Sequence, residues 1–301
     1  TTLFRSATLN IHLQLFRTMG WKAPKYVHTA QLMKMDGGSK RKLSKRKDPE
    51  LALDFYNAEG YPVPSVLEYL MTLLNSNFED WRLANPTAPM GDFQFTTKKM
   101  GNSGSLFDID KLKDVSKNTI SVMSADQVYD EVTAWAKDFD PQLYTLLTAD
   151  EQKAKAIFAI GRGGAKPRKD IAIWSEVKDY VAFFYEELFT AASEYPENVS
   201  TQDALDILTQ YRSLYSPADD GETWFNKVRE LGESLGFAAK PKDYKKNPDQ
   251  YKGHVGDVSQ VIRLAITGRT NSPDLCSVMQ ILGEEVCQQR LAQAIELLSN
   301  R

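Results

Sequence analysis

Apolar residues recur at the spacing of an α-helix along most of this chain. The clearest stripe falls at i, i+3 and i+4 positions and consists of Val66, Leu67, Leu70, Leu73 and Leu74. Such a stripe predicts a helix with one face buried in a core. Similar runs cover residues 10–17 and 149–160, and three more follow between residues 258 and 298. The pattern predicts a mainly α protein, with one short strand at residues 26–35.

Helix start signals agree with this pattern. Asp48 and Pro49 supply an N-cap and a first-turn proline, so a helix is expected to run from here to about Ala58. Ser124 and Gln127 have the spacing of a capping box.

Length and composition indicate an ordinary globular protein. The chain has 301 residues, of which 42% are hydrophobic and 11% aromatic, so two or three cores are expected. No apolar run is long enough for a membrane span, and residues 1–20 lack a signal-peptide layout. We therefore expect a cytoplasmic protein with no membrane partner. Cys276 and Cys287 lack metal-ligand spacing, so reduced core thiols and no metal site are expected.

Positive charge is concentrated near the start of the chain. Residues 1–60 carry eleven Lys or Arg against five Asp or Glu, whereas residues 181–301 carry twelve against eighteen. Within residues 36–49, six cations surround Ser44: Lys40, Arg41, Lys42, Lys45, Arg46 and Lys47. Gly37 and Gly38 precede them and are expected to remove side-chain obstruction. The hydroxyl and the cations suit a triphosphate, although a solvated loop or a nuclear-localisation-like tract has the same composition.

Two further basic stretches follow. Residues 161–169 contain Arg162, Lys166, Arg168 and Lys169 but lack the spacing of a Walker loop. They suit either phosphate contact or a helix C-cap with solvated cations. Residues 240–248 place Tyr244 between lysines, an arrangement typical of either a plain surface loop or a site that stacks a base and pairs with phosphates.

Lys42-Leu43-Ser44-Lys45-Arg46 resembles the second signature of class I aminoacyl-tRNA synthetases, in the form typical of glutamyl-tRNA synthetases. Residues 20–37, 53–70 and 262–283 resemble segments of the same bacterial family, and residues 178–189 resemble one of its helices, so the resemblance spans about residue 5 to 300. His254 and the three residues after it look superficially like the adenine-binding signature of that family. Because they follow the basic loop instead of preceding it, we expect no ATP contact there.

The resemblance implies a specific fold: the end of a Rossmann-type catalytic domain with its ATP loop (residues 1–55), a helical stem-contact region (56–120) and two all-helical anticodon-binding subdomains (121–190 and 191–301). It departs from the family pattern at Asp114 and Ser116, where a tryptophan and an asparagine are expected.

The implied function is ATP-dependent activation of glutamate and its transfer to the 3′ end of the glutamate tRNA. By the resemblance Lys45 and Lys42 are catalytic, and ATP with Mg²⁺ is bound by Lys42, Ser44, Lys45 and Arg46. Contacts to tRNA are implied for the second basic stretch, through Arg162, Lys166, Arg168 and Lys169.

Two alternatives remain open. A glutaminyl-tRNA synthetase shares the signature, but that family usually ends in β-barrels. A non-catalytic tRNA-binding module would share the helical part. The resemblance also implies that the first half of the catalytic domain lies outside this sequence. We therefore expect the 301-residue chain to be a monomer that folds but makes no glutamyl adenylate by itself.

Overall fold

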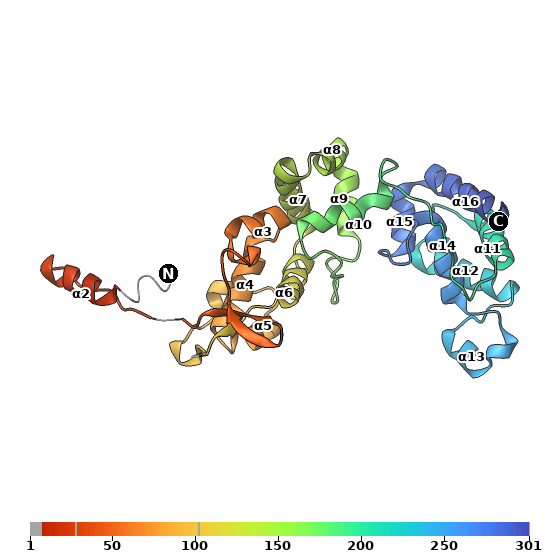
Figure 1. Ribbon diagram of the computed structural model, residues 1–301. Helices are drawn as coiled ribbons and strands as arrows, with labels where there is room; N and C mark the ends of the chain where they lie inside the picture. Colours follow the sequence, from red (N-terminus) through yellow and green to blue (C-terminus); the bar gives the residue numbers. More distant parts are fainter. Residues whose placement is uncertain (1–7, 28, 102, 301) are drawn as a thin grey trace. The chain divides into compact units, whose positions relative to one another are not determined.

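The computed structural model describes residues 8–27, 29–101 and 103–300 (Figure 1). His28, which closes one segment of the family resemblance, lies outside the described residues. The chain divides into two compact units. Unit 1 comprises Thr1–Asn57 and Val63–Ser116, and unit 2 comprises Ala58–Pro62 and Lys117–Arg301.

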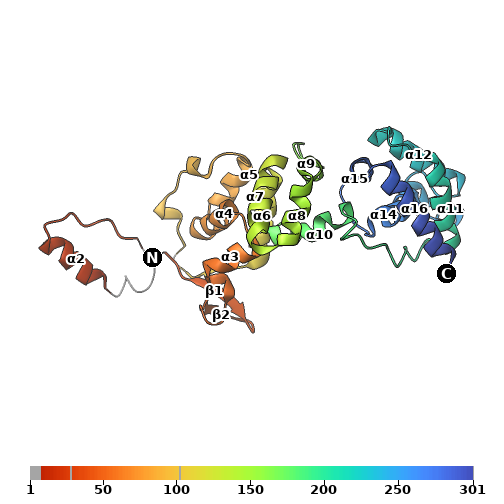
Figure 2. The same cartoon turned by 90° about the horizontal axis from the view of Figure 1, so that it is seen from above.

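Unit 1 combines short helices with a small sheet. Its elements are α2 (Leu9–Thr18), β1 (Leu32–Asp36), β2 (Ser39–Lys42), η1 (Pro49–Leu51), α3 (Leu53–Glu59), α4 (Val63–Leu74), α5 (Phe78–Ala84), η2 (Met90–Asp92), η3 (Thr97–Lys99), β3 (Ser105–Leu106) and the start of α6 (Ile109–Ser121). The sheet has the order β2-β1-β3, with β1 antiparallel to β2 and parallel to β3. Figure 2 shows the β1–β2 hairpin at the edge of unit 1.

Two local predictions for unit 1 are confirmed and one is wrong. The helix at residues 10–17 is α2, and the strand is β1, although it begins only at Leu32. The single helix expected from Asp48 to Ala58 is instead split into η1 and α3, because Ala52 is extended with φ −96° and ψ 137°. The Asp48 side chain makes no capping hydrogen bond and is engaged elsewhere.

The apolar stripe of α4 is only partly covered, with Val66, Leu73 and Leu74 half-buried. Leu67 and Leu70 are 44% and 40% exposed, whereas Ser65 and Tyr69 are buried. The Tyr69 hydroxyl accepts a hydrogen bond from the Asp108 backbone N–H at 2.6 Å, and its ring packs edge-on against Phe107. The prediction of a core stripe was wrong for Leu67 and Leu70, because the segment at Phe107 and Asp108 packs on the Tyr69 side of α4.

Unit 2 is helical. It contains α7 (Ala125–Phe139), α8 (Pro141–Ala149), α9 (Glu151–Ala159), η4 (Trp174–Glu176), α10 (Val177–Val181), η5 (Ala182–Phe184), α11 (Thr201–Leu214), α12 (Gly221–Ser234), α13 (Pro241–Lys246), η6 (Pro248–Gln250), α14 (Val255–Thr267), α15 (Leu275–Leu282) and α16 (Glu284–Ser299). The Ser124–Gln127 capping box is present at the start of α7. The three C-terminal helices are confirmed as α14, α15 and α16, so the mainly α fold class holds.

One helix of unit 2 is shorter than predicted. The run at residues 178–189 forms only α10 and η5, and the chain is extended at Tyr185. Phe183, Phe184 and Tyr185 are all buried. Three consecutive buried side chains cannot share one face of a surface helix, so the core is better filled by an irregular turn.

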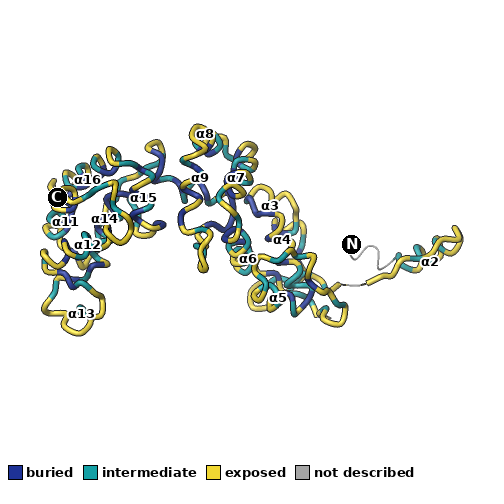
Figure 3. Tube along the Cα trace, turned by 180° about the vertical axis from the view of Figure 1, so that it is seen from behind, coloured by how far each residue is buried: buried dark blue, intermediate teal, exposed yellow. Residues whose placement is uncertain are grey.

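A continuous apolar core joins the helices of unit 2, and Figure 3 shows its buried positions along the inward sides of the helices. The thiols of Cys276 and Cys287 are free and buried there, as expected. Arg290 is also buried, and its guanidinium donates to the carbonyl oxygens of Phe183 and Ile266 at 2.8 and 2.7 Å. Across the described parts of both units, no helix is long and apolar enough to span a membrane.

Candidate functional site

The basic loop begins at a tight hairpin turn. Asp36 pairs with Ser39 across the two strands, and the intervening Gly37 and Gly38 have φ of 54° and 85°. Two successive positive φ values are typical of the turn that best matches strand twist. A Cβ on either glycine would meet nothing within 4 Å, so the glycines are needed for their backbone conformation and not, as expected from the sequence, to remove an obstruction.

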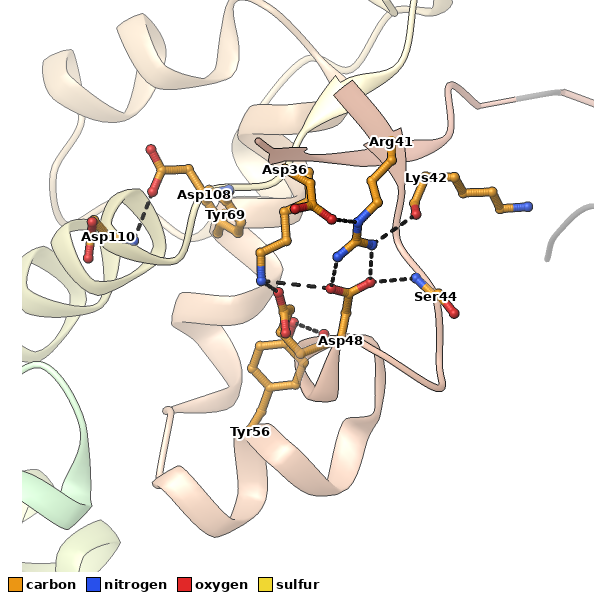
Figure 4. A network of polar contacts seen from close by, with 11 residues as sticks. Asp36, Arg41, Lys42, Ser44, Asp48, Tyr56, Tyr69, Asp108 and Asp110 are labelled. Atoms are coloured by element: carbon orange, nitrogen blue, oxygen red, sulfur yellow. Dashed lines mark hydrogen bonds and ion pairs between the residues drawn. The ribbon is translucent and has the colours of Figure 1, made fainter. Parts of the chain in front are cut away.

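Asp48 anchors the base of this loop (Figure 4). Its carboxylate is 2% exposed and accepts two hydrogen bonds from the Arg41 guanidinium, at 2.6 and 2.7 Å. It also accepts one from the Ser44 backbone N–H at 2.7 Å. These donors, Arg41 first, hold the pKa of Asp48 well below its usual range. Asp48 therefore fixes both the strand that precedes the signature and the serine at its centre.

Further contacts complete the anchor. Arg41 also donates to Asp36 at 2.6 Å, and Lys34 on β1 pairs with Glu50. The Glu50 backbone oxygen accepts a hydrogen bond from the Tyr56 hydroxyl, whose pKa is raised to about 12 mainly by burial. Arg41 is therefore engaged within the protein and is not available to a triphosphate. Five of the six cations predicted from the sequence remain.

The signature begins at Lys42, the last residue of β2, and continues into the turn that Asp48 holds. Leu43 is buried, and its N–H donates a hydrogen bond to the backbone oxygen of Leu32. The backbone oxygen of Ser44 accepts hydrogen bonds from the N–H groups of Lys47 and Asp48. The cations from the end of β2 through this turn are exposed and make no ion pair with any described residue: Lys42, Lys45, Arg46 and Lys47. In Figure 4 the Lys42 ammonium points away from Asp48. The result is a cluster of free cations around one serine, on a fixed base.

Replacing Asp48 with asparagine is expected to loosen this turn, since the anchor then loses its charge. The expected result is faster hydrogen exchange at the amides of Ser44 and Lys47, measured by mass spectrometry on peptides that cover residues 43–48. Asp54→Asn, which changes an exposed carboxylate on α3, is the control and should leave this exchange unchanged. Equal exchange in both variants would contradict an anchoring role.

The same anchor has a defined pH dependence. A carboxylate whose pKa is lowered in the folded state contributes stability above its unfolded pKa of about 4 and loses it as the pH falls through the lowered value. The contribution from Asp48 is therefore fully present near neutral pH. Protection of the Ser44 amide should disappear only under strongly acidic conditions.

The second basic stretch divides into structural and free cations. The Arg162 guanidinium donates to the carbonyl oxygens of Phe158 and Ile120, both at 2.6 Å, and its burial lowers its pKa. Arg168 forms a bidentate pair with Asp170 at 2.6 and 2.8 Å. Lys166 and Lys169 are exposed and make no ion pair with any part of the chain that the structure describes. Two of the four cations expected to contact RNA are therefore already engaged by the protein.

A cleft of about 260 Å³ opens beside Arg168 in unit 2. Arg269 lines it and forms a bidentate pair with Asp179 at 2.6 and 2.9 Å. Tyr180 and Phe183 add aromatic surface, and burial raises the pKa of Tyr180 to about 12. Both arginines are neutralised by their own carboxylates, so the cleft suits a planar polar group better than a free phosphate. Sequence reasoning missed this site because Arg269 and Asp179 are far apart in the chain.

His254 and the three residues after it lie at the start of α14. The His254 ring accepts a hydrogen bond from the Gly256 N–H, and the Asp257 carboxylate accepts one from the His254 N–H, so this motif caps α14. No group of three or more metal-binding side chains occurs among residues 8–27, 29–101 and 103–300.

Comparison with protein families identifies the larger part of unit 2. Residues 127–295 match the family described as anticodon binding domain. The chain belongs to this family. The cleft beside Arg168 and the second basic stretch both lie within this anticodon binding domain, whereas the anchored cation turn lies before it.

Whole-chain relatives extend across both units. The chain is 48% identical over 289 residues to a glutamate–tRNA ligase of Acetivibrio thermocellus, covering 96% of this chain and 53% of that protein. It is 47% identical over 296 residues to a glutamate–tRNA ligase of Clostridium beijerinckii, covering 97% and 54%. The chain thus spans about half the length of the curated relatives it matches. A crystal structure of a glutamate tRNA ligase from Elizabethkingia meningosepticum has a similar fold, with a TM-score of 0.64, 20% identity and coverage of 97% of this chain and 55% of that one.

Proposed function

We propose that this chain is part of a glutamate–tRNA ligase and supplies its ATP loop and its tRNA-binding helices. The observation that carries the proposal is the turn of free cations around Ser44, held by the buried Asp48. The relatives named glutamate–tRNA ligase match across this turn and across the anticodon binding domain.

The proposed chemistry of the turn is electrostatic. Lys45 would stabilise the charge that develops on the triphosphate as pyrophosphate leaves, and Lys42 and Arg46 would add supporting positive charge. The Ser44 hydroxyl would donate to a phosphate oxygen. Mg²⁺ would arrive with ATP as the counterion of its phosphates. The Asp48 anchor would hold the backbone of this turn in one conformation. The loop would therefore need to rearrange less when ATP binds.

The anticodon binding domain would hold the tRNA. Lys166 and Lys169 would pair with backbone phosphates, while Arg162 and Arg168 would shape the loop that carries them. The cleft lined by Arg269 and Tyr180 would accept an unstacked base of the anticodon arm, because paired guanidinium groups and aromatic rings suit a base edge and a base face. A cytoplasmic monomer is the corresponding proposed state.

The glutaminyl alternative fits the structure less well. Unit 2 contains no β-strand among its described residues, only one isolated bridge between Ala238 and His254. The alternative of a non-catalytic tRNA-binding module is tested by ATP–pyrophosphate exchange with glutamate, using protein expressed from the complete gene. Exchange that depends on glutamate supports the ligase, whereas tRNA binding without exchange would favour the module. That the 301-residue chain makes no adenylate by itself stays a prediction.

Neutralising the free lysines of the second basic stretch is expected to weaken tRNA binding. Lys166→Gln with Lys169→Gln should make the slope of log affinity against log salt shallower by roughly one to two units. Affinity is measured for a glutamate tRNA transcript at several salt concentrations. Lys22→Gln with Lys25→Gln, which removes two exposed charges from the segment after α2 in unit 1, is the matched control. A slope identical to that of the parent would exclude these lysines as phosphate contacts.

A further inference from the structure

A lysine-rich excursion leaves the helices of unit 2 between α12 and α14. It covers residues 239–253, hereafter the lysine loop, and contains α13 and η6. A parallel bridge between Ala238 and His254 closes its base. The Ala238 N–H donates to the Gly253 oxygen and the Val255 N–H donates to the Ala238 oxygen, both at 2.9 Å. The two ends of the loop are therefore joined by backbone hydrogen bonds and not merely tethered.

The lysine loop has a fixed shape but adds little to the core. The Tyr244 ring lies edge-on to the His254 ring, with centroids 5.8 Å apart, and His254 in turn caps α14. None of the six residues of α13 is buried. Figure 3 shows the tube mostly exposed around α13. Because the lysine loop is ordered but contributes little to the core, packing does not explain its lysine side chains.

Within the described part of residues 181–301, the Lys and Arg side chains without an engaged partner are concentrated in the lysine loop. Residues 181–301 carry twelve Lys or Arg, of which five lie in the loop. Most described cations outside the loop are engaged by the protein itself: Arg212 with Gln288, Lys227 with Asp219, Arg263 with Ser272, Arg269 with Asp179, and Arg290 in the core. Inside the loop only Lys252 is paired, with Asp203.

Four lysines of the loop are therefore left over. Lys240, Lys242, Lys245 and Lys246 are exposed and form no ion pair with any described residue. The same 121 positions carry eighteen Asp or Glu, and Asp243 and Asp249 lie in the loop itself. Since acids outnumber bases here, general surface solubility would not require four unpaired lysines in one place.

We propose that the lysine loop is a second contact surface for the sugar–phosphate backbone of RNA. Ammonium groups on an exposed loop suit phosphates, which need charge but no fixed bidentate geometry. A membrane surface fits less well, because no large exposed apolar side chain occurs in residues 239–253 that could insert between lipids. The proposal rests on the proposed function, in which the protein binds a tRNA.

The location of the loop agrees with this partner. In Figures 1 and 3 the segment between α9 and α10, which carries Lys166 and Lys169, extends downward from the helices of unit 2, and the α13 loop extends in the same direction. Contacts of α15 with α9 and with η5 join these two halves of unit 2. One elongated polyanion can therefore reach both groups of free lysines from one side.

The test removes two of the free charges and keeps the loop. Lys245→Gln with Lys246→Gln, in protein expressed from the complete gene, should weaken binding of a glutamate tRNA transcript roughly ten-fold at about 100 mM salt. The slope of log affinity against log salt should become shallower by about one to two units. Lys245→Arg with Lys246→Arg, which retains the charge, should bind like the parent, and Lys22→Gln with Lys25→Gln, which removes two exposed charges outside the proposed tRNA-contact regions, should leave affinity and slope unchanged.

The outcomes separate this inference from the function on which it rests. If the parent does not bind the transcript, the proposed function falls first. If the parent binds and the Lys245/Lys246 glutamine variant equals it, or only matches the loss in the Lys22/Lys25 variant, the lysine loop is not an RNA contact. Unchanged tRNA binding together with lost binding to vesicles of phosphatidylserine and phosphatidylcholine would overturn the inference in favour of a membrane surface.

Discussion

Replacing Lys45 with alanine, in protein expressed from the complete gene, is expected to lower the rate of glutamate-dependent ATP–pyrophosphate exchange by about 10²- to 10³-fold, or about 3–4 kcal/mol of transition-state stabilisation. Lys45 is exposed on the turn that follows Ser44 and makes no ion pair with any described residue, so its charge is available to a ligand. The turn is held in place by Asp48 and does not depend on the Lys45 side chain. The loss should therefore appear in the rate, with little change in the KM for glutamate.

Lys40→Ala is the matched control for this experiment. Lys40 is an exposed lysine of the same hairpin, but it lies on β2 opposite Met35 and outside the turn. Its removal changes the net charge equally and should leave exchange within about two-fold of the parent. If Lys40→Ala and Lys45→Ala were equally active, the cation turn would not be the ATP site.

Gly268→Ala is expected to reduce the free energy of unfolding of unit 2 by about 2–5 kcal/mol. Gly268 ends α14 with φ 69° and ψ 6°, and its N–H donates to the Leu264 oxygen at 2.8 Å. A left-handed conformation costs an L-residue about 1–2 kcal/mol. A Cβ here would also lie 2.0 Å from the Thr190 backbone oxygen, so the backbone itself would have to move. Both costs act on the same residue.

The stability change is measured by urea denaturation followed through helical circular dichroism. Gly221→Ala is the control, because Gly221 is the first residue of α12 and a Cβ there meets nothing within 4 Å. That substitution should be neutral or stabilising by up to about 1 kcal/mol, since alanine is the better helix former. Equal midpoints for the two variants would mean that Thr190 can withdraw from Gly268 at no cost.

Sequence reasoning worked best where the decisive contacts are local. The capping box of Ser124 and Gln127 and the three C-terminal helices depend on residues a few positions apart, and the pattern of the chain displays them directly. The ATP-loop signature is likewise a continuous stretch. Its assignment to Lys42, Ser44, Lys45 and Arg46 stays a prediction that the exchange experiment tests.

Predictions from the sequence failed where tertiary contacts decide which partner a side chain meets. Asp48 fits the sequence pattern of an N-cap, but the carboxylate gains more from the nearby Arg41 guanidinium and the Ser44 N–H than from a capping bond. Leu67 and Leu70 fit the pattern of a core stripe, yet the segments that cover α4 lie on the side of Tyr69. Periodicity shows that a helix has an apolar face, but it does not show which face finds a neighbour.

The sequence by itself determined the mainly α class, the capping box of α7 and the position of the cation turn, because each follows from propensities and contacts within a few residues. Only the tertiary structure decided which cations are free. Arg162 is held by the Ile120 carbonyl, Arg269 by Asp179, and Lys252 by Asp203, over separations of 42, 90 and 49 residues. The charge of a lysine or arginine can be read from the chain, but its availability to a ligand depends on whether folding places an acceptor beside it.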